Sequence, residues 1–217
     1  MQNWHPILRI ARWITPGGSK MASILLSLQR TILAGIVLLI LIVLIADAST
    51  GHWINFNAAW WAFFMRWLHV LSGVMWIGLL WYLNFVQTPT MPTIEPAEHR
   101  AAITKYIAPN VLFWFRYSAL STVVTGLILG QQMGYFPNAL IFKSDYAIGV
   151  GMWLALIMAF NVWFIIWPNQ KKALGLVDCP ADQKPKAARI ATLTSRVNML
   201  FSIPMLYCMV AQQNGGL

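Results

Sequence analysis

Acidic residues are scarce in this sequence, and charged residues of either sign are few. Asp and Glu together occupy 6 of 217 positions, and all charged residues make up 10% of the chain, against roughly 25% in soluble domains. Hydrophobic residues reach 59%. A soluble fold is excluded, and we expect an all-α integral membrane protein, a bundle of about five transmembrane helices with an amphipathic N-terminal segment.

The sequence also lacks the usual cofactor motifs. It has two cysteines, no C-x-x-C-H for covalent haem, no glycine-rich phosphate loop, and no cluster of Cys, His and carboxylate side chains for a closed metal site. No cofactor or metal is therefore encoded by a clear motif. A non-covalent haem stays an option that motifs do not exclude.

Five apolar segments are long enough to cross a bilayer. We expect residues 1–23 to form a cytoplasmic amphipathic or interfacial segment and residues 24–217 to form the membrane domain. Pro89 and Pro168 are interpreted as loop signals after the second and fourth spans, and Pro204 is expected to kink the fifth. The spans are expected at about residues 30–47, 58–86, 110–133, 146–167 and 189–211.

The basic residues lie between the spans rather than in one patch, which excludes nucleic acid as a partner and leaves the lipid bilayer. Eleven fall on one side of the membrane and Lys143 alone on the other, so the N-terminus is expected in the cytoplasm and the C-terminus outside it. The eleven are Arg9, Arg12, Lys20, Arg30, Arg100, Lys105, Lys171, Lys172, Lys184, Lys186 and Arg189.

Three further arginines, Arg66, Arg116 and Arg196, lie inside predicted spans, where each costs at least ~2.5 kcal/mol on insertion scales. All six acidic residues lie in loops or at span ends. Asp47 or Asp145 can reach Arg66 on the outer half of the membrane, but Arg116 and Arg196 on the cytoplasmic half have no evident counter-ion.

Two interpretations of Arg116 and Arg196 remain open. In the first, both guanidinium groups bind an anionic small molecule in an inward-facing pocket, together with Asn84 and Asn161 at a similar depth. In the second, both side chains reach the cytoplasmic headgroups or cap backbone carbonyls.

The second span carries the densest group of candidate residues. Arg66, His69, Gly73 and Trp76 recur at helical spacing and share one face. His69 is the only histidine inside a span, and a buried imidazole acts as a proton carrier, a metal or haem ligand, or a hydrogen-bonded packing residue. One such histidine excludes a bis-histidine haem in the monomer. A haem b would need a different second ligand, a five-coordinate site or a subunit interface.

Three stretches carry a family resemblance: His69-Val-Leu-Ser-Gly-Val-Met-Trp-Ile-Gly through Gln87, Arg116-Tyr-Ser-Ala-Leu, and Ser195-Arg-Val-Asn through Met205. They resemble the N-terminal membrane domain of the bacterial membrane-bound, cytochrome-c-linked urate oxidases (urate hydroxylases), over roughly residues 57 to 212. The resemblance implies a bacterial inner-membrane protein that oxidises urate and passes electrons to the respiratory chain. The family's cytochrome c domain is expected to be absent, so a separate cytochrome c or another membrane subunit would accept the electrons.

Three functions fit these observations. The first is an oxidoreductase acting on an anionic purine-like substrate, with His69 and Arg66 as catalytic residues. The second is a non-catalytic subunit of a respiratory or other energy-converting complex, binding haem, quinone or lipid. The third is an anion transporter, against which the absence of an internal repeat counts. The expected substrate-binding residues are Arg116, Arg196, Asn161, Asn84, Trp76 and Asn198.

Overall fold

The structure is a computed structural model that describes residues 20–51 and 53–216. Most of the expected amphipathic segment, residues 1–19, lies outside the described residues. The described part is helical, without strands, and contains five helices long and apolar enough to cross a membrane, which confirms the expected fold class. These helices span Leu28–Thr50, Ala58–Thr93, Glu98–Gln132, Tyr146–Ala173 and Gln183–Asn214.

The chain divides into two compact units, Met1–Asn55 and Phe56–Leu217. The described part of the first unit contains α2 (Lys20–Leu25) and α3 (Leu28–Thr50). Helix α3 ends at Gly51, whose φ of 69° suits a left-handed C-cap and whose N–H donates to Asp47 O. None of the residues of α3 is buried, and an apolar helix with no buried face is suited to lipid.

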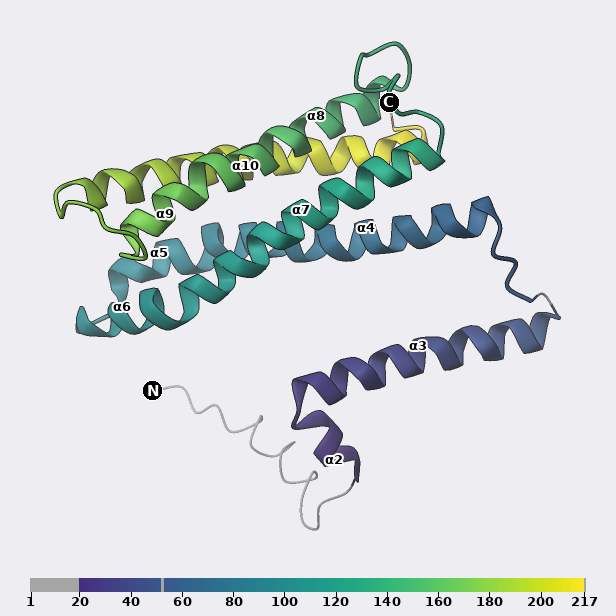
Figure 1. Ribbon diagram of the computed structural model, residues 1–217, viewed down its shortest axis with the longest axis horizontal. Helices are drawn as coiled ribbons and strands as arrows, with labels where there is room; N and C mark the ends of the chain where they lie inside the picture. The colour runs from purple at the N-terminus through teal and green to yellow at the C-terminus, as the bar shows by residue number, and fades with distance from the viewer. Residues whose placement is uncertain (1–19, 52, 217) are drawn as a thin grey trace. The chain divides into compact units, whose positions relative to one another are not determined.

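The second unit contains the other four spans (Figure 1). The second span is α4 (Ala58–Trp81), η1 (Tyr82–Gln87), α5 (Thr88–Thr90) and η2 (Met91–Thr93). The third is α6 (Glu98–Ala102), η3 (Ile103–Ile107) and α7 (Ala108–Gln132). The fourth is α8 (Tyr146–Phe160), η4 (Asn161–Ile166) and α9 (Trp167–Ala173), and the fifth is α10 (Gln183–Asn214).

Prolines explain the three π-helical turns. The turns η1, η3 and η4 end two residues before Pro89, Pro109 and Pro168, respectively. Proline has no N–H to donate and its ring crowds the carbonyl four residues earlier, so the helix widens locally instead of stopping. The interpretation of Pro89 and Pro168 as loop signals is therefore wrong, because the helix continues past both. Helix α10 likewise runs through Pro204 without a break.

The four spans pack as two pairs, α4 beside α7 and α8 with α9 beside α10 (Figure 1). Small residues allow close approach within each pair: a Cβ added at Gly126 on α7 would lie 2.8 Å from His69 Cε1, and one at Gly151 on α8 would lie 3.2 Å from Cys208 Cβ. The main core fills one half of the unit. Its largest fully buried apolar side chains are Trp76, Phe115, Leu80, Met158 and Val162.

Candidate functional site

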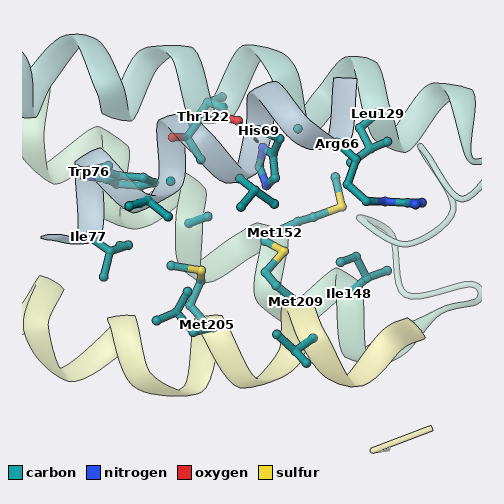
Figure 2. Close-up of a pocket in the computed structure, with 18 of the residues that line it drawn as sticks. Arg66, His69, Trp76, Ile77, Thr122, Leu129, Ile148, Met152, Met205 and Met209 are labelled. Atoms are coloured by element: carbon teal, nitrogen blue, oxygen red, sulfur yellow. Dashed lines mark hydrogen bonds between the residues drawn. The ribbon is translucent and has the colours of Figure 1, made fainter. Parts of the chain in front are cut away.

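A cavity of about 620 Å³ lies between α4, α7, α8 and α10, within the usual size range of small-molecule sites. Its walls come mainly from the second half of α4 and the second half of α7, facing α8 and the end of α10. As their spacing predicts, Arg66, His69, Gly73 and Trp76 all line it. Figure 2 shows His69 and Arg66 on one wall, with Met152, Met205 and Met209 on the other.

The His69 ring is bound to α7 through one of its two nitrogens. Nδ1 lies 2.9 Å from the backbone carbonyl oxygen of Thr122 and 3.3 Å from Thr125 Oγ1. A carbonyl can only accept, so Nδ1 must carry the proton that it donates to Thr122. In the neutral ring Nε2 is then unprotonated and has a lone pair available.

Gly126 is the reason that the ring can reach α7. Any side chain at this position would collide with the imidazole, because the added Cβ would lie 2.8 Å from Cε1 and 3.1 Å from Nδ1 of His69. The contact is ring against backbone, which leaves little freedom for either to move aside. Helix packing therefore fixes both the position of His69 and its tautomer.

Arg66 and Tyr135 line the same cavity as His69. Arg66 Nη2 donates to Met133 Sδ at 3.2 Å, and its Nε is buried without a partner. Burial raises the pKa of Tyr135 above its ordinary value, against a smaller opposing effect of the Arg66 charge. The Tyr135 hydroxyl is therefore a neutral donor at neutral pH.

The sequence indicates that Asp145 can pair with Arg66, but the side-chain hydrogen bonds of Asp145 go to other residues. Asp145 accepts from Ser144 Oγ at 2.6 Å and from Gln212 Nε2 at 2.9 Å. The Arg66 guanidinium is thus held by a thioether, a weak acceptor, and keeps capacity to bind an anionic group.

Arg116 lies in the other half of the unit and is 8% exposed. Its guanidinium carbon lies 3.3 Å from the ring centroid of Trp167 and 5.9 Å from that of Trp163. Its Nε and Nη1 are buried with no hydrogen-bond partner. Arg116 is therefore a buried cation covered by aromatic rings, with unused donors.

The predicted site residues do not all come together. Arg196 is exposed, and among the described residues no hydrogen bond or ring contact joins it to Arg116. The three asparagines instead bond within the bundle. Asn84 Nδ2 donates to Leu80 O and Ser195 Oγ, both at 2.9 Å, Asn161 Nδ2 to Asn198 Oδ1 at 2.8 Å, and Asn198 Nδ2 to Met158 O at 3.0 Å. Substrate binding by these residues stays a prediction.

Several residues at the His69 site were missed by sequence reasoning. Thr122 and Gly126 hold the ring, and the methionines on α8 and α10 face it across the cavity. One signal for the α7 partner was present: the hydroxyl residues Ser118, Ser121, Thr122 and Thr125 recur at helical spacing in an otherwise apolar span. Polar side chains so placed favour contact with another helix in a membrane.

Comparison with protein-family models gives a match for the C-terminal part of the chain. Residues 142–215 match the family model described as "Urate oxidase N-terminal". The matched range covers α8, η4, α9 and α10 and includes the stretch from Ser195 to Met205. Searches of the curated proteins and of the solved structures find no significant match.

Proposed function

We propose that this chain, whose residues 142–215 match the urate oxidase N-terminal family model, is a membrane-embedded oxidoreductase. It would take electrons from a planar purine-like anion such as urate and pass them to a separate acceptor, a cytochrome c or another membrane subunit. The observation that supports this most directly is the cavity beside His69, where one imidazole nitrogen has a lone pair that can take up a proton or bind a metal.

The reaction balances with water as the oxygen source. A urate monoanion and one water give the neutral hydroxylated product, one proton and two electrons. One-electron acceptors such as cytochrome c take these electrons in two steps, and the proton leaves to water. The protein's part is to bind the anion next to the group that first receives an electron.

Arg116 supports the substrate side of this proposal. An anion that contacts its guanidinium would use donors that have no partner, and a planar anion could stack on the neighbouring tryptophans. Arg116 and Thr122 are six residues apart on α7, about 9 Å along the helix axis. Arg116 does not line the cavity, so a substrate bound there would lie outside it, about that far along α7 from the Thr122 that holds His69.

Turnover tests the proposal. The purified full chain in lipid nanodiscs is mixed with urate and ferricyanide, and both absorbances are followed. We expect two ferricyanide ions reduced per urate consumed. Arg116→Met should lower kcat/KM at least ~10-fold, the effect of about 1.4 kcal/mol in transition-state binding.

Arg196→Met is the matched comparison, since it removes the same charge at an exposed position. A much smaller effect there would assign the anion to Arg116 alone, whereas equal losses would support the predicted shared site. No urate consumption with one-electron acceptors, together with no urate binding in equilibrium dialysis, would contradict the enzyme assignment.

The second candidate is a non-catalytic subunit of an energy-converting complex. The mostly apolar lining of the cavity favours this option, because such a wall suits a haem, a quinone or a lipid better than a small anion. Stoichiometric partner chains that co-purify with the protein, with no turnover by the isolated chain, would favour it over the enzyme.

The proposal also includes location. We place the chain in the bacterial cytoplasmic membrane with its N-terminus in the cytoplasm and its C-terminus in the periplasm. The supporting observation is the distribution of lysine and arginine between the spans, with eleven on the proposed cytoplasmic side and Lys143 alone on the other.

A further inference from the structure

The hydrogen bonding of His69 is the arrangement that prepares an imidazole to bind a metal. Histidine ligands in proteins almost always donate their second ring N–H to a carboxylate, a backbone carbonyl or water, which fixes the tautomer and makes the other nitrogen a better ligand. Here Nδ1 donates to the Thr122 carbonyl at 2.9 Å. The nitrogen that remains is Nε2.

The neighbouring residues restrict the kind of metal. Among the described residues, no group of three or more His, Cys, Asp or Glu side chains could bind a metal ion. A bare ion would therefore have His69 as its single strong protein ligand, too few for a stable site. A metal bound here would have to bring its own equatorial ligands, as the iron of haem does.

The cavity supplies what a haem requires beyond one histidine. Its walls are mostly apolar, and its volume is about 620 Å³. Across from His69 lie the thioethers of Met152 on α8 and of Met205 and Met209 on α10 (Figure 2). Arg66, on the His69 face of α4, has a buried Nε without a partner and could pair with a propionate.

From these observations we propose that the cavity binds one haem b, with His69 Nε2 as one axial ligand of the iron and a methionine thioether from the opposite wall as the other. Both proposed iron ligands come from a single chain, so no second histidine is needed. The ligand pair is that of c-type cytochromes and favours a comparatively high reduction potential.

This inference deepens the proposed function and rests on it only for what the haem does. In that setting a haem held by His69 would supply one-electron redox chemistry between the substrate and the separate acceptor. Iron ligation occupies Nε2, so it excludes the predicted role of His69 as a proton carrier.

Spectra of the full-length protein test the haem site. The chain is expressed with a haem precursor in the medium, purified in mild detergent, and examined oxidised and dithionite-reduced. We expect a Soret band and about one haem per chain by the pyridine haemochrome assay. If the purified protein shows no Soret band and titration with haemin also produces none, the proposal is overturned.

Variants assign the axial ligands. His69→Ala should lose the Soret band while eluting as the wild type does on size-exclusion chromatography. His69→Gly should regain it when imidazole is added, which a merely misfolded protein would not do. His99→Ala, at an exposed position on α6, is the matched control and should keep the wild-type spectrum. A wild-type spectrum in His69→Ala would contradict the assignment.

The methionine ligand is tested one position at a time. Met152→Leu, Met205→Leu and Met209→Leu conserve size, and one of them should convert the low-spin spectrum to a high-spin one and remove the near-infrared band of iron–thioether ligation. If none of the three alters the spectrum, the thioether assignment is wrong.

The haem test and the turnover test fail independently. Urate consumption by a protein without haem would overturn this inference and leave the proposed function intact. A haem protein that neither binds nor consumes urate would overturn the proposed function and leave the haem site intact.

Discussion

Arginines in this chain differ in what surrounds their charge. Arg116 is 8% exposed and lies against the face of Trp167, whereas Arg196 is exposed. Placing an arginine in the bilayer costs at least ~2.5 kcal/mol, and a desolvated cation–π contact stabilises the folded protein by about 2 kcal/mol. The two magnitudes are similar, so Trp167 can offset much of the cost at Arg116 without an acidic partner.

Trp167→Leu should therefore destabilise the protein by about 2 kcal/mol, through loss of the ring under the guanidinium. Thermal unfolding in detergent measures the effect. In a double-mutant cycle with Arg116→Met, the two changes should be less than additive, because either one removes the same contact. Trp114→Leu, at a tryptophan that is 57% exposed, is the control and should have little effect. Strict additivity would show that Trp167 does not compensate the Arg116 charge.

At the scale of elements, the second unit is held by polar contacts across helix pairs as well as by apolar packing. His69 joins α4 to α7, and Asn161 at the start of η4 joins that span to α10 through Asn198. Each contact uses a side chain that would be costly to leave unpaired in lipid. The helix pairs are thus fixed in register by a few buried hydrogen bonds.

Asn161→Leu tests this role. The change removes the donor to Asn198 Oδ1, a bond of 2.8 Å between buried side chains, and should cost about 1 kcal/mol, as interhelical hydrogen bonds in membranes do. Denaturant titration in mixed micelles measures the loss. Asn110→Leu is the control, because Asn110 is exposed and donates only within its own helix. Equal stability of the two variants would contradict a role for Asn161 in joining the helices.

At the scale of the whole molecule, the five candidate spans place the two ends of the chain on opposite sides of a membrane if all five cross it. The proposed orientation puts the loop between α9 and α10 in the cytoplasm, because Lys171, Lys172 and Lys184 lie around it. Cys179 lies in this loop and is partly exposed, whereas Cys208 is 7% exposed inside α10.

The native cysteines therefore report the topology. A membrane-impermeant maleimide should label the protein in inside-out vesicles and leave it unlabelled in intact cells or spheroplasts. Cys179→Ser should abolish labelling, since Cys208 is buried. Labelling of the wild type from the outside of intact spheroplasts would reverse the proposed orientation.

The sequence by itself determined the membrane fold, the number of spans and the shared face of Arg66, His69, Gly73 and Trp76. These follow from hydrophobic content and from the period of a single helix, which are local properties of the chain. The family resemblance was also carried by short contiguous stretches, and the matched range of residues 142–215 includes one of them.

Only the tertiary structure decided which partners the inward-facing residues contact. The Thr122 carbonyl that sets the His69 tautomer, the methionines across the cavity and the tryptophan against Arg116 all come from other helices. The order in which helices pack, and the rotation of each about its axis, depend on contacts between residues far apart in sequence. Helical periodicity therefore predicted which side chains share a face of their own helix, and packing decided which of them share a site.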